Sequence, residues 1–278
     1  MKRMMVVLSL ALALITLSGC IARPVEGIIG GADGPTAIIV GETKEPENYV
    51  LICRVVEEDD GYLVLADTES AAGVYTLTTR DIPVVWDEGA VSSREKEIAE
   101  GSLVVITYGG ECAESWPMQP GGVTEIRVLG YGFDDMCQMY LEVLEDLWEE
   151  DEGLNGDITA VSVDLAGTSL SPSEQAAVRW IFGNECRIPN VLDLSMEDLD
   201  AEGYITHEEN GFTHWKDGVY LAITEEALEG TYNGMVPVKF DAWKWRSSLG
   251  AYFFSDCTSA RNGMGSWSDY NVGAHMIS

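Results

Sequence analysis

The sequence has few basic residues and lacks the short signatures of common enzymes. It contains 16 Lys and Arg against 47 Asp and Glu, which gives a formal net charge of −31. Such a chain repels nucleic acids, and no basic stripe interrupts the acidity, so we set nucleic-acid binding aside. There is no G-x-S-x-G, H-E-x-x-H or glycine-rich phosphate loop, and the three histidines share no ligand spacing. We therefore expect no cofactor and nominate no catalytic residue.

The cysteines lie far apart along the chain. None of the 6 forms a C-x-x-C pair, which argues against a zinc knuckle or a thioredoxin-type redox site. When Cys20 is set aside for the reason given next, an odd number remains, so at least one thiol is unpaired unless it bonds another chain. The sequence does not indicate which of these pair: Cys53, Cys112, Cys137, Cys186 and Cys257.

The amino-terminal segment has the layout of a lipoprotein signal. Two basic residues precede an uncharged apolar run over 4–18, and Leu17-Ser18-Gly19-Cys20 forms a lipobox. We expect residues 1–19 to be removed and the Cys20 thiol to carry a diacylglycerol. Each buried CH₂ contributes roughly 0.8 kcal/mol, so two acyl chains hold a protein stably on a membrane. No later run reaches 18 apolar residues. The prediction is a protein anchored by lipid to the outer face of the cell membrane.

Residues 20–47 are predicted to form a lipidated tether that contains one sharp motif. Residues 30–36 read Gly-Gly-Ala-Asp-Gly-Pro-Thr. They resemble the beta subunit of sodium-pumping, biotin-dependent decarboxylases, a resemblance that would make Asp33 a Na⁺ ligand inside the bilayer. That subunit needs many transmembrane helices, which this sequence lacks after its signal. We therefore interpret the motif as a turn between two short apolar strands and keep the transport reading as a minor alternative.

Residues 48–132 have the pattern of a small β domain. Short runs rich in Val, Ile, Thr and Tyr are separated by turn clusters, and a helical turn is expected over 93–100. Such a pattern favours a small closed barrel of the OB or SH3-like kind. The stretch resembles a β domain of Gram-positive lipoproteins that carries a Ser-aromatic-Pro signature, here Ser115-Trp116-Pro117. The expected strands are 49–57, 61–67, 74–79, 103–109 and 123–130.

Residues 133–278 are predicted to form an α+β domain with two helices on an antiparallel sheet. Helical spacing of apolar residues covers 134–150. A second helix begins at Ser171-Pro172-Ser173-Glu174, where Ser171 and Glu174 form a capping box and Pro172 takes the first position, and it ends at Gly183 or Asn184. The expected strands are 158–165, 219–224, 236–245, 249–258 and 267–277.

This second region resembles an uncharacterised module found in lipoproteins of Gram-positive anaerobes. The resemblance covers nearly all of 140–278 and implies no activity. Its carrying residues include Trp180-Ile181-Phe182-Gly183, Trp215-Lys216-Asp217-Gly218 and the run 244–254, Lys-Trp-Arg-Ser-Ser-Leu-Gly-Ala-Tyr-Phe-Phe.

One segment has the spacing of a calcium-binding EF-hand loop. Oxygen-bearing residues stand at positions 1, 3, 5 and 12, with Gly203 at position 6. Two features favour a different interpretation: Asn210-Gly211 would end the exiting helix at once, and Ser195 with Asp198 caps a short helix that Gly203 terminates. A calcium-dependent module stays an alternative, with these ligands: Asp198, Asp200, Glu202 and Glu209.

An aromatic set on the late strands is the best candidate for a binding face. Strand alternation makes the sheet apolar on both sides, so one face packs the helices and the other is either covered or free to bind. Arg246 is expected either to pair with Asp241 or Asp256, or to stack on Trp243 or Trp267 and meet a ligand. The candidate ligand-binding residues are Trp243, Arg246, Tyr252 and Trp267.

The expected function is a binding or structural role at the cell envelope. The rival class is an envelope hydrolase, with an unidentified acid/base pair or a Cys257/His275 dyad. An aromatic cleft without converging acid and base groups favours binding, whereas two facing carboxylates favour catalysis.

Overall fold

The structure is a computed structural model that describes residues 48–70, 73–92, 97–226 and 235–278. The predicted signal, Cys20, the tether and the Gly-Gly-Ala-Asp-Gly-Pro-Thr motif lie outside the described residues. Residues 46–278 form one compact unit that contains two main sheets. We call the part before residue 133 the β lobe and the rest the α+β lobe. In the described part of the chain, no helix is long and apolar enough to cross a membrane.

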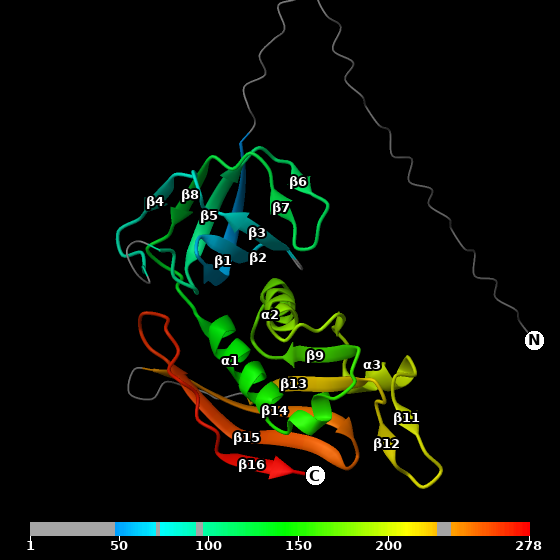
Figure 1. Cartoon of the computed structure of the whole chain (residues 1–278). Helices are drawn as coiled ribbons and strands as arrows, with labels where there is room; N and C mark the ends of the chain where they lie inside the picture. Colours follow the sequence, from blue (N-terminus) through cyan, green and yellow to red (C-terminus); the bar gives the residue numbers. More distant parts are fainter. Residues whose placement is uncertain (1–47, 71–72, 93–96, 227–234) are drawn as a thin grey trace, which may run out of the picture. The chain divides into compact units, whose positions relative to one another are not determined.

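The β lobe is built on a six-stranded sheet in the order β3-β2-β1-β5-β8-β4. This sheet is open, because its edge strands β3 and β4 do not pair with each other, so the prediction of a closed barrel is not confirmed (Figure 1). The expected helical turn lies partly outside the described residues, and 97–100 are not helical. The strands are β1 (Tyr49–Asp59), β2 (Tyr62–Asp67), β3 (Val74–Thr78), β4 (Val84–Trp86), β5 (Leu103–Tyr108), β6 (Cys112–Ala113), β7 (Gln119–Pro120) and β8 (Glu125–Val128).

The α+β lobe confirms the predicted fold class but not a purely antiparallel sheet. Strand β9 pairs in parallel with both β10 and β13, whereas β13, β14, β15 and β16 pair antiparallel in turn. The last strand is shorter than the expected 267–277: β16 begins only at Ala274, so Trp267 lies outside it. The elements are α1 (Met136–Glu149), the 3-10 helix η1 (Glu152–Asn155), β9 (Ala160–Gly167), α2 (Pro172–Glu185), β10 (Val191–Leu192), α3 (Met196–Ala201), β11 (Thr206–His207), β12 (Thr213–His214), β13 (Gly218–Glu226), β14 (Val236–Ser247), β15 (Gly250–Arg261) and β16 (Ala274–Ile277).

Two capping boxes set the starts of α2 and α3 as the sequence predicts. The Ser171 hydroxyl accepts from the Glu174 amide (3.3 Å), and the Glu174 carboxylate accepts from the Ser171 amide (2.8 Å). Ser195 and Asp198 repeat this exchange at α3. The α+β lobe therefore has a short third helix in addition to the two that the sequence predicts on the sheet. Each box satisfies amides that the first helical turn leaves unpaired.

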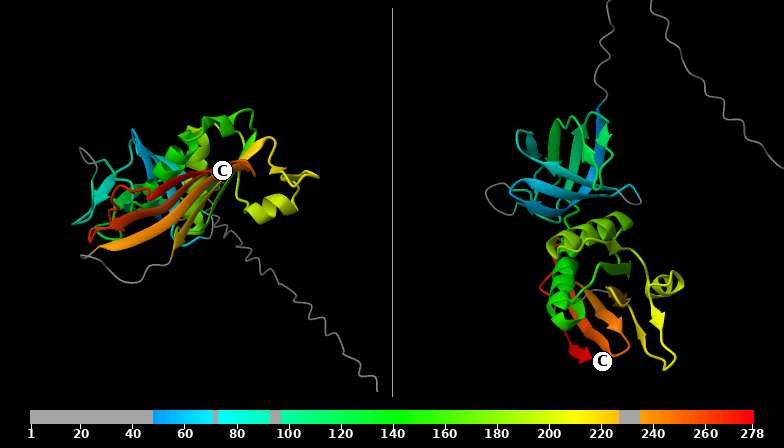
Figure 2. Two further views of the ribbon diagram at one scale, coloured as in Figure 1. Left: turned by 90° about the horizontal axis from the view of Figure 1, so that it is seen from below. Right: turned by 45° about the vertical axis from the view of Figure 1, so that its right-hand side comes forward.

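The two faces of the larger sheet are covered by different parts of the chain. Helices α1 and α2 pack on one face, where the main core lies, and α3 lies on the other (Figure 2). The second face forms a smaller core in which Leu199 of α3 packs with Trp215, Tyr220 and Trp245. The sheet is therefore apolar on both sides, as predicted, and the segment around α3 rather than the β lobe covers part of the second side.

The β lobe contributes to the main core and is tied to α2 by polar contacts. Val56 and Val64 belong to the same apolar cluster as α1 and α2. The Ser173 hydroxyl, buried at the start of α2, accepts from the Gly73 amide (3.0 Å). Arg54 Nε donates to the Glu174 carboxylate at 3.3 Å. The carboxylate that caps α2 therefore also holds β1.

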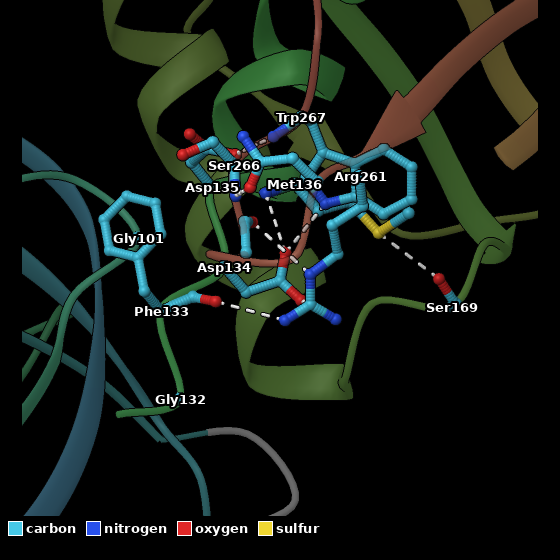
Figure 3. A network of polar contacts seen from close by, with 12 residues as sticks. Gly101, Gly132, Phe133, Asp134, Asp135, Met136, Ser169, Arg261, Ser266 and Trp267 are labelled. Atoms are coloured by element: carbon cyan, nitrogen blue, oxygen red, sulfur yellow. Dashed lines mark hydrogen bonds and ion pairs between the residues drawn. The ribbon is translucent and has the colours of Figure 1, made fainter. Parts of the chain in front are cut away.

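A polar clasp fixes the segment that links the lobes (Figure 3). The Asp134 amide donates to the Gly101 carbonyl of the β lobe (2.9 Å). Arg261 Nη1 lies 3.2 Å from the Asp134 carboxylate, and its Nη2 donates to the Phe133 carbonyl (3.1 Å). Trp267 Nε1 donates to Asp134 at 2.9 Å. This clasp joins the end of β15 to the start of α1.

Candidate functional site

The structure does not bring the four predicted ligand-binding residues together. Tyr252 is buried in the main core, whereas Trp267 is partly buried and packs against that core. The Trp267 ring nitrogen already donates to Asp134. Trp243 packs with the smaller core on the opposite face of the sheet. There it is half-buried, stacked on Phe253 with ring centroids 5.8 Å apart and planes 4° apart. A single aromatic site built from these residues is therefore not formed.

Arg246 has a structural role that differs from the predicted one. Its Nη1 donates to the carbonyls of Leu154 (2.8 Å) and Gly156 (2.6 Å), and its Nη2 donates to the Lys216 carbonyl (2.8 Å). It pairs with neither of the acids expected, because Asp241 accepts from the Asp256 amide and Asp256 pairs with Lys239. The guanidinium instead ties β14 to the η1 turn.

Lys244 of β14, which was not among the predicted site residues, is fully buried. Lys244 Nζ donates to the carbonyls of Trp148 (2.9 Å) and Glu150 (2.6 Å), at the C-terminal end of α1. Those carbonyls lack helical partners and carry the negative end of the helix dipole, which favours a cation. Burial lowers the pKa of Lys244 to about 8, against the opposing influence of nearby acids such as Asp151.

The EF-hand candidate is not formed as a loop and exiting helix. The hairpin of β11 and β12 follows α3 where the exiting helix would stand. Asp198 is used in its capping box, and Asp200 lies 2.7 Å from His207 Nε2. Among the described residues, no group of three or more His, Cys, Asp or Glu side chains has a metal-binding arrangement. Gly203, at a φ of +83°, ends α3 as its sequence predicts.

The proposed cysteine dyad is not formed either. Cys257 is completely buried in the main core, and burial raises the pKa of its thiol to about 12. His275 Nδ1 lies 3.1 Å from the Tyr252 hydroxyl instead, and its strand partner is Phe254. All five described cysteines are free thiols. A thiol with so high a pKa is a poor nucleophile.

One pair of interacting carboxyl groups does not have the arrangement of a glycosidase pair. Glu145 of α1 hydrogen-bonds Glu185 of α2, and this bond raises the pKa of Glu145 to about 8. Carboxyl groups in a glycosidase stand roughly 5–9.5 Å apart, so that a sugar fits between them. A pair joined by a hydrogen bond leaves no such room. The hydrolase alternative therefore gains no support from these two residues.

A cavity that none of the predicted site residues line lies between α2 and the β6–β7 hairpin. It has a volume of about 620 Å³, within the range of about 300–1,000 Å³ typical of small-molecule sites. Trp116, at the tip of the hairpin, lines one part and is 56 % exposed. The α2 side chains Gln175, Arg179 and Trp180 line another part, and the residues after α2 complete it. We call this cavity the Trp116 groove.

Backbone pairing holds Trp116 at this position. The hairpin pairs Cys112 with Pro120, and the residue after Pro117 is tied to β3. The Met118 amide donates to the Val74 carbonyl, and its carbonyl accepts from the Thr76 amide, both at 2.9 Å. Because β3 itself contacts α2, the hairpin tip is carried to the helix surface. The indole thus stands exposed on an anchored hairpin.

Several polar groups of the Trp116 groove have no partner within the described part of the chain. The Asn184 carboxamide and the indole N–H groups of Trp116 and Trp180 make no hydrogen bond there. Arg179 donates through Nη2 to Asp193 (2.7 Å), but its buried Nη1 has no partner. Polar groups without a protein partner beside aromatic rings are suited to bind a ligand.

Both tryptophans of this groove lie in motifs of the sequence, but the sequence does not indicate that the two motifs meet. Trp116 belongs to the Ser-aromatic-Pro signature and Trp180 to the Trp180–Gly183 motif. Comparison of the chain with protein-family models, with curated proteins and with solved structures finds no match. The resemblance to Gram-positive lipoproteins thus stays a prediction from the residues that carry it.

Proposed function

We propose that this protein is an extracytoplasmic lipoprotein, anchored by lipid on Cys20 to the outer face of the cell membrane, that binds a ligand in the Trp116 groove. The anchor rests on the lipobox in the sequence. The binding role is supported by one observation above the others: two tryptophans and unpaired polar groups from both lobes line the same cavity. An envelope-facing binding protein needs such a groove and needs no catalytic pair.

Replacement of Cys20 tests the anchor. Cells that express the full-length protein are labelled with a fatty acid, and the label is followed on the protein and in the membrane fraction. We expect wild type to be labelled, and Cys20→Ala to lose the label and either leave the membrane or stay unprocessed. Cys112→Ala is the matched control, because its half-buried thiol lies in the β lobe and should leave labelling intact. Labelling that persists in Cys20→Ala would contradict the proposal.

A further inference from the structure

We infer that the Trp116 groove binds an uncharged oligosaccharide, through its indole rings and its unpaired hydrogen-bonding groups. The inference deepens the proposed function and depends on it, because it names the class of ligand for that groove. Three features of the molecule lead to it: the charge of the groove, the chemistry of its walls, and the main chain around it.

The charge of the groove differs from that of the protein as a whole. Its lining contains one cation, Arg179, and one anion, Asp193, which pair with each other at 2.7 Å. The chain carries a net charge of −31. Two other cavities are more acidic: one of about 290 Å³ is lined by four acids without a base, and one of about 440 Å³ by four acids and two arginines. A neutral cavity in so acidic a protein favours a ligand without charge.

The walls combine flat apolar rings with planar polar groups. An indole ring packs against the C–H face of a sugar ring, and its N–H and the carboxamide of Asn184 can bond hydroxyl groups at the ring edge. The Arg179 guanidinium, which pairs with Asp193, lies beside them in the lining. Sugars present this alternation of C–H faces and hydroxyl edges along a chain. A purely apolar ligand would leave these polar groups unpaired and would bind less well.

The main chain around the groove offers little to a peptide. An extended peptide binds by adding a strand to a sheet edge. The edge strand here, β10, has only two residues. Pro172 and Pro189, which also line the groove, have no N–H to donate. A saccharide, which bonds through hydroxyl groups rather than through a peptide ladder, fits these walls better.

Calorimetric titration of the full-length protein in detergent micelles tests the inference. The probes are the uncharged tetramers of N-acetylglucosamine and of glucose, and the tetramer of glucosamine serves as a cationic comparison. We expect saturable binding of at least one uncharged tetramer. Trp116→Ala should weaken that binding by about tenfold or more, because a stacking ring is lost. The fold should be unchanged, since Trp116 is 56 % exposed.

Tyr131→Ala is the matched control, because this aromatic residue is 69 % exposed and does not line the groove. It should bind the tetramer like wild type. Asn184→Ala provides a second variant on the α2 side and should weaken binding several-fold.

Four results would overturn the inference. One is failure of both uncharged tetramers to bind, and another is binding that Trp116→Ala leaves intact. Tighter binding of the cationic tetramer, insensitive to Trp116→Ala, would show attraction to the acidic surface instead. A neutral proline-rich peptide that requires Trp116 would replace the saccharide as ligand while leaving the groove as a binding site. Fatty-acid labelling is independent of these titrations, so the anchor and the ligand class can fail separately.

Discussion

The last turns of α1 contact two charged regions of opposite character. At the end of the helix, Lys244 donates to the carbonyls of Trp148 and Glu150. On the side of the helix, Glu145 meets Glu185 of α2, a carboxyl group against a carboxyl group. The net charge of −31 therefore does not show how charged groups are arranged at these two regions of α1. Two cations of β14, Lys244 and Arg246, donate to main-chain carbonyl groups. Acidic side chains instead meet each other between α1 and α2.

The two regions also respond differently to protons. The cationic end is a set of charge-assisted hydrogen bonds, which contribute more than neutral ones. On the acidic side, burial raises the pKa of Glu57 to about 7, with further contributions from the charges of Glu185, Glu100 and Asp59. Glu57 lies on β1, so this acidic side includes the β lobe as well as α1 and α2. We expect the cationic end to stabilise the fold and the acidic side to make its stability depend on pH.

The largest effect is expected at the cationic end. Lys244→Met keeps the length of the side chain but removes all donors. The Glu150 carbonyl then loses its partner, and the Trp148 carbonyl keeps only the Asn155 amide. We expect the free energy of unfolding to fall by about 3 kcal/mol. Urea unfolding of the full-length protein in micelles measures it. Lys216→Met, on an exposed side chain, is the control and should change stability by less than about 0.5 kcal/mol. Equal stability of both variants would mean that Lys244 contributes no net stabilisation.

A smaller effect is expected at Arg246. Arg246→Lys keeps the charge but cannot bond three carbonyls from one planar fork, so the η1 turn is held less firmly to β14. We expect a loss of about 1–2 kcal/mol, since the group is only partly buried. Thermal unfolding detects it, with the exposed Arg80→Lys as control. A variant as stable as wild type would show that a single ammonium group replaces the fork, and that the carbonyls are satisfied by water.

Local signals in the sequence predicted much of this fold. Ser171, Glu174 and Pro172 fixed the start of α2 because a capping box needs only residues within one turn. Strand alternation likewise placed β1, β2, β5 and β14 close to their observed limits. These features depend on neighbours in the chain, which a single sequence contains.

The contacts that define the candidate sites are long-range and were not predictable in the same way. Lys244 donates to the carbonyl of Glu150, 94 residues away in the chain. The alternation of side chains along β14 places Lys244 on the same face as the buried Ala242, where a lysine is not expected. The parallel pairing of β9 with β13 joins strands separated by α2, α3 and a hairpin. The Trp116 groove depends on where β3 meets α2. The one available signal was the presence of Trp116 and Trp180 in two motifs of the sequence.

The smallest effect is expected on the acidic side of α1, where it changes the pH dependence of stability. The hydrogen bond to Glu185 raises the pKa of Glu145 to about 8 in the folded protein, from a model value of 4.5. Between these values the folded state binds more protons than the unfolded state, so stability falls as pH rises. The contribution is fully present below about pH 4.5 and is lost as pH passes 8. Glu57, with a pKa of about 7, acts in the same direction.

Glu145→Gln tests this assignment, because an amide can still donate to Glu185 but cannot titrate. We expect wild type to lose stability between pH 5 and pH 8, measured as the urea midpoint in micelles at low salt. The variant should show a shallower decline and should exceed wild type at pH 8. Glu114→Gln, an exposed acid of the β6–β7 hairpin, should keep the wild-type slope. If Glu145→Gln also keeps that slope, Glu145 does not retain the proton, and the two sides of α1 differ in geometry without differing in their response to pH.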